Sequence, residues 1–387
     1  MIINNDKRYQ LNSIIITFFL FQYSLLIPVM YLLSPKIVCA ISGSICMIVL
    51  FVFNAKNAIS YKILLFFLIS FLIIGIKMLI SFETSVYFPL YFVIYTVPAG
   101  IVFLYQYSCN YILKYGYYFS LINFVINAAG PWLPWYEYMR FGYGMLITAV
   151  FLFYEIARDN SSEISPKKNT IFNIVVICFS LFEMIIYGSR GATFSFLVFV
   201  FIYLIIIERK HIVRNSIIIS GSILLLFKIE KILRFLQMIA LKIGIRSYAL
   251  GQYINQLNSK WEIASSGRNQ LYSDAISKFY EHPILGNAIR PESYSGAYAH
   301  NLFIQVAQDL GIFAVVILIL FLVVIIISVF NNKTEYSTRV VFAIFFSISI
   351  GRLMFSSVLW ERPEFWMLIC LYLTSGLQSN NKLLHFR

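Results

Sequence analysis

Charged residues are scarce in this chain of 387 residues, because Asp, Glu, Lys and Arg together make up only 12% of it. Soluble domains carry about twice that share. Hydrophobic residues make up 60%, with 37 Phe and 27 Tyr. This composition excludes an ordinary soluble domain and is typical of an integral membrane protein.

Sequence patterns for metals and nucleotides are also missing. The five cysteines lie inside or beside apolar runs, and they form neither a disulfide framework nor zinc-ligand spacing. The chain has no Walker A phosphate loop and no dinucleotide-binding fingerprint. It also lacks an internal repeat, a low-complexity linker and a second soluble domain. We therefore expect a single membrane domain over residues 1–387 that uses no metal and no cofactor.

Twelve apolar runs approach the roughly 20 residues that a helix needs to cross a bilayer. They lie near residues 11–33, 37–54, 62–81, 85–105, 110–128, 141–157, 170–187, 191–207, 213–229, 303–330, 340–358 and 364–378. The fifth and ninth runs fit least well. The first follows Lys7 and Arg8 but is too long for a signal peptide, so we expect a retained helix. The predicted fold is an all-α polytopic membrane protein with about twelve transmembrane helices.

Positive charges predict the orientation of these helices, because short loops rich in Lys and Arg stay on the cytoplasmic side. With the N-terminus inside, the inside segments contain Lys7, Arg8, Lys56, Lys62, Lys114, Arg158, Lys167, Lys168, Arg209, Lys210, Arg214, Lys333, Arg339, Lys382 and Arg387. The short outside loops contain only Lys36, Arg140, Arg190 and Arg362. Both termini are therefore predicted to be cytoplasmic, and residues 228–300 to form one large outside loop. The net charge of +13 follows from this topology and is not evidence for a nucleic-acid partner.

The outside loop contains one predicted amphipathic helix, which begins after Gly267-Arg268. Its apolar face consists, at three- and four-residue spacing, of Leu271, Ala275, Ile276, Phe279 and Tyr280. His282-Pro283 should end it, because the residue before a proline avoids the helical region. The helix is either a cap that lies on the bilayer or the bundle, or a means of positioning Arg268.

Three polar residues are predicted to share the outer face. Arg190 starts a span, Arg268 lies in the loop, and His300 stands where the chain re-enters the membrane. Guanidinium groups bind diphosphate oxygens in a bidentate manner and stay charged, and a histidine can take a proton from a sugar hydroxyl. Together they suit the displacement of a phosphate leaving group. Each alone has a simpler interpretation, because an arginine at a span end is commonly an interfacial anchor and a loop histidine is commonly solvated.

Other candidates are less specific. Three charges inside predicted spans either line a cavity or, as we favour, form structural pairs: Lys77, Glu183 and Arg352. Four carboxylates could orient His300 or act as bases: Asp274, Glu281, Glu292 and Asp309. Trp132 and Trp135 would form either an interfacial belt or a platform that stacks on sugar.

The order of these motifs resembles that of the O-antigen ligase and O-antigen polymerase superfamily of bacterial envelope glycosyltransferases. The most specific motif of that family is His followed by Asn, Ser or Gln, nine residues, Gly, two residues, and Gly, Thr or Tyr. Here His300-Asn301 and Gly311 match, while Ala314 departs, although a small residue there should preserve close helix packing. Its other signatures resemble Arg190-Gly191, Gly267-Arg268 and the Pro-x-x-Gly element at residues 283–286. The resemblance covers residues 188–314, and the first 180 residues match only in hydropathy.

The resemblance implies a helical bundle of the lipid-linked-sugar glycosyltransferase type (GT-C-like) in the bacterial inner membrane, with the large loop in the periplasm. It implies a glycan carried on undecaprenyl diphosphate and transferred without a metal or a nucleotide sugar. Arg190 and Arg268 would hold the diphosphate, and His300 would activate the acceptor hydroxyl. Arg290 and Asn301 are predicted to complete the substrate contacts. Membrane lipid and a chain-length regulator protein are further expected partners.

The acceptor separates the related activities. A polymerase uses another lipid-linked repeat unit of lipopolysaccharide O-antigen, a ligase uses lipid A core, and a third variant uses protein. The abundance of Ile, Phe and Tyr and the low charge favour the polymerase. A lipid-linked-oligosaccharide flippase is the alternative from another class, but such carriers tend to have related halves and short external loops. This chain has no visible repeat and one long outside loop.

Overall fold

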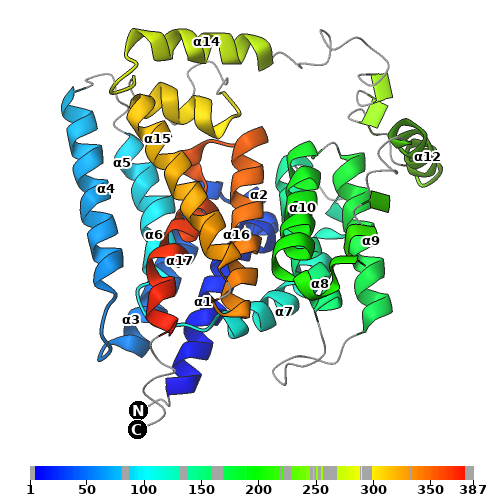
Figure 1. Cartoon of the computed structure of the whole chain (residues 1–387), viewed down its shortest axis with the longest axis horizontal. Coiled ribbons are helices and arrows are strands. Elements are labelled where there is room, and N and C mark those ends of the chain that lie inside the picture. The colour runs from blue at the N-terminus through cyan, green and yellow to red at the C-terminus, as the bar shows by residue number, and fades with distance from the viewer. Residues whose placement is uncertain are drawn as a thin grey trace.

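The computed structural model describes residues 5–80, 87–130, 138–158, 169–187, 189–213, 215–217, 220–221, 228–244, 247, 250–251, 254–255, 268–287, 289, 299–331 and 333–379. Throughout these residues the chain is helical or irregular, and none of them lies in a β-strand. Figure 1 shows an upright bundle of helices, with α14 lying across its upper end. The all-α prediction is confirmed.

The helices of the bundle begin and end close to the predicted apolar runs. In chain order they are α1 (Asn5–Leu25), α2 (Ile27–Leu32), α3 (Pro35–Asn54), α4 (Tyr61–Ile80), α5 (Tyr87–Tyr91), the π-helical η1 (Phe92–Thr96), α6 (Val97–Ile101), α7 (Cys109–Asn127), α8 (Tyr138–Ala157), α9 (Thr170–Ile186), α10 (Arg190–Phe201), the π-helical η3 (Ile202–Ile207), α15 (Leu302–Phe330), α16 (Tyr336–Phe355) and α17 (Pro363–Ser379). Short 3-10 turns form η4 (Arg209–His211) and η5 (Leu359–Glu361). Two further helices, α12 (Ile229–Lys242) and α14 (Arg268–Glu281), lie in the region predicted as the outside loop.

Several of these helices have the length and composition of membrane spans. Within the described residues, five are long and apolar enough to cross a bilayer: Pro35–Asn54, Tyr61–Leu79, Arg190–Ile207, Leu302–Val329 and Tyr336–Phe355. Shorter apolar helices cover Phe88–Ile101, Phe141–Ala157 and Thr170–Ile186. Much of the surface of α4 and α15 consists of exposed Leu, Ile, Val and Phe side chains, which suits contact with lipid. These features support a membrane-embedded protein.

Two predicted runs differ from the simple pattern. The run at 11–33 is divided, because α1 ends at Leu25 and α2 begins at Ile27 with Pro28 in its first turn, a position that proline tolerates. Most of the run at 213–229 lies outside the described residues. The other weak run, at 110–128, forms the helix α7.

Hydrogen bonds between distant segments define two ends of the bundle. At the end drawn as lower in Figure 1, the Asn54 amide donates to Asn12 Oδ1 at 2.9 Å. At the upper end, the Lys77 ammonium donates to the Gly286 carbonyl at 3.0 Å. Helix α4 connects the two ends, since it begins at Tyr61 and carries Lys77 near its last turn. We refer to these as the lower and upper ends.

Polar side chains link helices inside the bundle. The Asn123 amide of α7 donates to the Gly144 carbonyl at 3.0 Å and to Thr148 Oγ1 at 2.8 Å, both on α8. One turn later, the Asn127 amide donates to the Ser24 carbonyl of α1 at 3.1 Å. Such bonds hold helices together where lipid offers no alternative partner. They therefore fix the relative positions of α1, α7 and α8.

Small residues let α10 and α16 approach closely. A Cβ atom built on Gly351 of α16 would lie only 1.7 Å from Ser195 Oγ and 3.1 Å from Ser195 Cα on α10. Such a close approach of backbones is the usual geometry of small-residue helix contacts in membranes. The position of α10, and of Arg190 at its start, therefore depends on this glycine.

The large predicted loop contains a helix that the sequence analysis missed. Helix α12 packs Leu233 and Ala240 against Ile186 at the end of α9. Helix α14 was predicted, and it ends at Glu281 just before His282-Pro283, as expected. On its predicted apolar face Ala275 is buried and Leu271 and Phe279 are partly buried, but Ile276 and Tyr280 are exposed. The predicted face was therefore too wide.

Replacing Gly351 with alanine should push α10 away from α16. We expect Gly351→Ala to destabilise the protein by about 1–3 kcal/mol, as overpacking of a tight contact generally does. The measurement is the midpoint of thermal unfolding of the purified protein in detergent. The double variant Gly351→Ala/Ser195→Gly removes the colliding side chain and should recover most of the loss. An unchanged midpoint for the single variant would show that this contact is not close.

Candidate functional site

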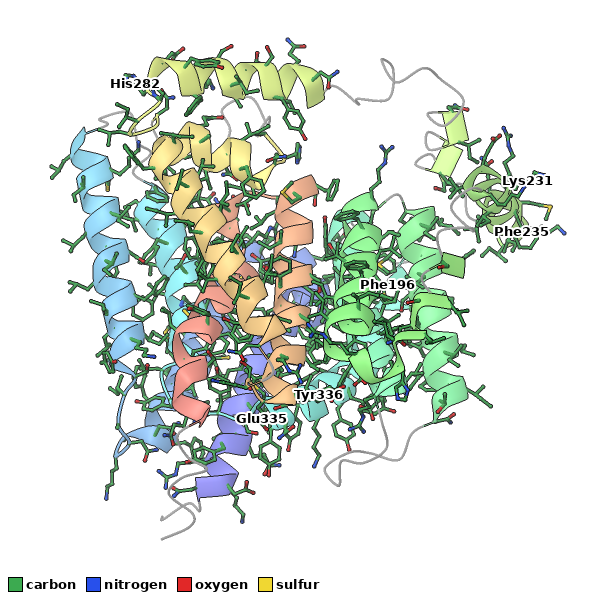
Figure 2. The ribbon with its side chains drawn as sticks, viewed as in Figure 1. Phe196, Lys231, Phe235, His282, Glu335 and Tyr336 are labelled. Atoms are coloured by element: carbon green, nitrogen blue, oxygen red, sulfur yellow. The ribbon has the colours of Figure 1, made fainter. Side chains whose placement is uncertain are left out.

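The predicted site residues stand at the starts of three helices at the upper end. Arg190 is the first residue of α10, Arg268 is the first residue of α14, and His300 precedes α15. Figure 2 labels His282, which follows α14, on the side of α4, so Arg268 begins that helix at the opposite end. The upper end thus carries segments that are more than a hundred residues apart in sequence.

Arg190 is partly buried, and its position is fixed through the residue that follows it. A Cβ atom on Gly191 would lie 2.0 Å from the Tyr143 hydroxyl oxygen and 2.9 Å from Phe355 Cβ. Only a glycine fits between α8 and α16 at this point. The Arg-Gly pair therefore starts α10 directly against the last turn of α16, and the guanidinium belongs to the upper end.

His300 has an unusual backbone conformation. Its φ of 48° makes it the one described non-glycine residue with positive φ. This left-handed conformation costs about 1 kcal/mol or more and is enriched at functional sites. The next residue, Asn301, accepts hydrogen bonds from the amides of Phe303 at 3.0 Å and Ile304 at 3.2 Å, and so caps the start of α15. The cap holds the partly buried His300 at a defined turn, and it gives Asn301 a structural role in addition to the predicted substrate contact.

A break in α15 explains why glycine stands ten residues after Asn301. Gly311 has φ 81° and ψ −177°, a combination that is essentially restricted to glycine. A Cβ atom there would lie 2.1 Å from the Ile284 carbonyl oxygen. The Ile312 amide, displaced from the helix, donates to the Pro283 carbonyl at 2.9 Å. The loop after α14 is therefore bonded directly to the break.

The second glycine of this contact is Gly286, in the Pro-x-x-Gly element. It has φ 70°, and a Cβ atom on it would lie 2.4 Å from the backbone nitrogen of Leu310. Beside it, the Asn287 amide donates to the Gln308 carbonyl at 2.7 Å. We call residues 283–287 and 308–312 the glycine junction. It attaches the C-terminal end of α14 to the first half of α15, while Ala314, just beyond it, packs against the main core.

Lys77 links the glycine junction to α4 through hydrogen bonds. Its ammonium donates to the carbonyls of Leu285 at 2.7 Å and Gly286 at 3.0 Å. The loop supplies acceptors for a charge that would otherwise be costly near the membrane. The preferred interpretation of Lys77 as a structural residue is consistent with these contacts, although its partners are carbonyl groups.

Asp309 links α15 to η5. Its carboxylate accepts hydrogen bonds from Trp360 Nε1 at 3.0 Å and from Gln305 Nε2 at 3.5 Å. The side-chain oxygen of Gln305, Oε1, in turn accepts a hydrogen bond from the backbone amide of Leu359 at 3.1 Å. Asp309 was a candidate for orienting His300, and these bonds give it a structural role in fixing α15. Neither Gln305 nor Trp360 was selected from the sequence, because a single Gln or Trp at a span end gives no signal of its partner.

Arg352 forms a buried ion pair. Its guanidinium lies 2.9 Å from Glu364 Oε1, donates to Ser357 Oγ at 3.2 Å and covers the Tyr143 ring at 4.6 Å. The expected ion pair of Arg352 is present, and both partners also line a small cavity. Glu183 has no such partner, since neither of its carboxylate oxygens accepts a hydrogen bond from the described residues although the side chain is buried.

The remaining predicted residues lie outside the described residues or on the exposed surface of α14. Arg290, Glu292, Trp132 and Trp135 lie outside the described residues, and the side chain of Arg268 is also outside them. Asp274 and Glu281 are exposed on α14. In the part of the chain that the structure describes, no group of three or more His, Cys, Asp or Glu residues could hold a metal ion.

Replacing Gly311 with alanine should separate the glycine junction. We expect Gly311→Ala to destabilise the start of α15 by about 1–3 kcal/mol, because alanine cannot adopt this φ and ψ without strain and its Cβ would meet a carbonyl oxygen. Limited proteolysis should then cleave residues 283–312 faster. Gly75→Ala is the matched control, since a Cβ atom there meets nothing within 4 Å. Equal cleavage of the two variants would contradict the junction.

The chain matches no model of a known protein family, and no curated protein is similar to it in sequence.

Proposed function

We propose that this protein is an O-antigen polymerase, a glycosyltransferase that joins undecaprenyl-diphosphate-linked repeat units during lipopolysaccharide biosynthesis. One observation carries the proposal: Arg190, Arg268 and His300 begin or precede three helices at one end of a bundle of apolar helices. A cationic, histidine-containing surface at a membrane face is what a lipid-linked diphosphate substrate requires.

The proposed topology has about twelve spans in the bacterial inner membrane. The upper end, with α12 and α14, would face the periplasm, and both termini would lie in the cytoplasm. The bias of Lys and Arg supports this orientation, because the segments at the lower end are rich in both residues and the short loops at the upper end are not. In this orientation the site faces the leaflet from which flipped lipid-linked units are used.

The proposed chemistry requires two anion-binding groups and one base. Arg190 and Arg268 would bind the donor diphosphate through their guanidinium groups, and the amides at the starts of α10 and α14 would add positive potential. His300 would take the proton of the acceptor hydroxyl while the oxygen of that hydroxyl attacks the anomeric carbon of the donor. The bond from that carbon to the diphosphate breaks, and the lipid diphosphate leaves with the bonding electrons. Arg290 and Asn301 complete the proposed substrate contacts.

The glycine junction gives this proposal a mechanical basis. It attaches α14 to the first half of α15, so the relative position of the segments that carry Arg268 and His300 is restricted. Catalytic groups need to be positioned to well under 1 Å, and a rigid support supplies this. The two glycines and Asn301 therefore support a role for this region in chemistry, because they hold His300 in place.

The polymerase and ligase activities share this site and differ in the acceptor. Composition favours the polymerase, because the chain is rich in Ile, Phe and Tyr and low in charge. The ligase remains the second candidate on the motif alone. The two are separated by the product that accumulates when the protein is missing.

The test is the lipopolysaccharide pattern of a strain that lacks the gene, detected on gels with an O-antigen antibody. Loss of the ladder, with core carrying a single repeat still present, is the result expected for a polymerase. Bare core with polymer accumulating on the lipid carrier would identify a ligase instead. A normal ladder would remove both activities from consideration.

Variants expressed in that strain test the residues. We expect His300→Ala, Arg190→Ala and Arg268→Ala to lower polymer formation by about 10²-fold or more, in line with the loss of a general base or a diphosphate contact. His282→Ala and Arg234→Ala are matched controls, because they remove the same side-chain types from α14's end and from α12. Membrane levels of each variant should be equal by immunoblot. A near-normal ladder with any of the three site variants would exclude that residue from the mechanism.

A further inference from the structure

A cavity of about 240 Å³ opens at the lower end, on the opposite side of the bundle from His300. It lies between the start of α1, the α3–α4 loop, the α6–α7 loop, the start of α16 and the last turns of α17. Figure 2 labels Glu335, one of its lining residues, at this lower end. No residue of the proposed transferase site contributes to it.

The walls of the cavity are rich in aromatic rings and carry one acidic group. Its rings come from Tyr9, Tyr61, Phe103, Tyr105 and Tyr107. Burial raises the pKa of the Tyr105 and Tyr107 hydroxyls above the usual value, so both remain neutral. No Lys or Arg is among the described residues that line it, and Glu335 is the one carboxylate. Such a lining has no charge with which to hold an isolated anion.

Ser60 provides a second observation that points to a ligand. Its side chain is 92% buried and lines the cavity, yet its hydroxyl oxygen has no hydrogen-bond partner among the described residues. Its backbone amide is already bonded to the Leu104 carbonyl at 2.9 Å, so the residue is held in place. Buried hydroxyl groups in folded proteins almost always have a partner. A polar group of a ligand would supply one.

The chemistry of this lining suits an ammonium group. Aromatic faces attract cations through the negative potential of the ring, and a carboxylate at the mouth adds charge complementarity. A primary ammonium carries three N–H donors, whereas a quaternary ammonium carries none. Because a primary ammonium can donate to the Ser60 oxygen and a quaternary ammonium can neither donate nor accept, the cavity favours a primary ammonium over a choline group.

The surroundings of the mouth indicate a lipid as the source of this ammonium. Ile59 and Tyr61 line the cavity and are 45% and 67% exposed. From there the exposed apolar side chains of Leu64, Leu65 and Leu68 continue along α4. Two acyl chains could lie along this strip while the headgroup enters the cavity. Lys62, next to Tyr61, supplies a cation for the lipid phosphate.

We propose that this cavity binds the headgroup of a phospholipid that carries a primary ammonium, of the phosphatidylethanolamine class. The ammonium contacts Glu335, the aromatic walls and Ser60, and the phosphate lies near Lys62. The bound lipid fills the space between the first, middle and last helices and stabilises the lower end. The proposal does not depend on the proposed transferase activity, because the two sites lie at opposite ends of the bundle.

Native mass spectrometry of the full-length protein, purified in detergent and supplied with one defined lipid at a time, tests the proposal. We expect dioleoyl phosphatidylethanolamine to remain bound, and the phosphatidylcholine and phosphatidylglycerol with the same chains to bind at least tenfold more weakly. The same lipid should raise the midpoint of thermal unfolding. Equal retention of the three lipids would overturn the proposal. Equal stabilisation by free ethanolamine would also overturn it, because it would identify a soluble amine as the ligand.

Substitutions of residues that line the cavity test whether the lipid binds there. Glu335→Gln keeps the oxygen that accepts from the Asn110 amide at 3.4 Å but removes the charge, and Ser60→Leu fills the cavity. Each should lower phosphatidylethanolamine retention about tenfold or more. Lys333→Gln removes a charge from the same loop without lining the cavity and should bind lipid normally. Normal retention by Glu335→Gln would contradict the proposal even if Ser60→Leu failed to fold.

Discussion

The upper end of this protein depends on the break in α15 at Gly311. A helix that is interrupted inside an apolar environment exposes backbone amides and carbonyls that have no water to bond with, and each must find a partner within the protein. Here the loop after α14 supplies those partners at Pro283 and Asn287. The same bonds that repair α15 therefore attach the loop to the bundle, so that local backbone chemistry decides the long-range arrangement.

The charges of the upper end fall into two groups with different physical roles. Arg352 is buried, paired with Glu364 and stacked on Tyr143, which makes it part of the support between α8, α16 and α17. A buried charge that loses its partner is strongly destabilising, so such a pair is poorly suited to exchange its contacts for a substrate. Arg190 starts a helix and is only partly buried, a position that suits the anion-binding role proposed for it.

The two ends of the bundle differ in chemistry as well as in position. Upper-end segments carry Arg190, Arg268 and His300, which suit an anionic substrate. The lower end contains an aromatic cavity with the carboxylate of Glu335 in its lining, which suits a cationic group. Polar contacts such as Asn123 with Thr148 hold the helices between these ends in register. The two ends therefore suit ligands of opposite charge.

The sequence alone determined the all-α class and nearly every bundle helix, because a bilayer-length apolar run has few alternatives to a helix. It also selected His300 and Gly311 as residues of one motif and Gly286 as part of a second one. Only the tertiary structure assigned their roles. The backbones around Gly286 and Gly311 pack so closely that neither position has room for a Cβ atom, and Asn301 caps α15. It also decided that Asp309 bonds to Trp360, that Arg352 pairs with Glu364, and that α12 packs on α9. These partners are separated in sequence by up to 54 residues, as Ile186 and Ala240 are. Residue type and spacing carry no information about which distant groups a packed bundle will bring into contact.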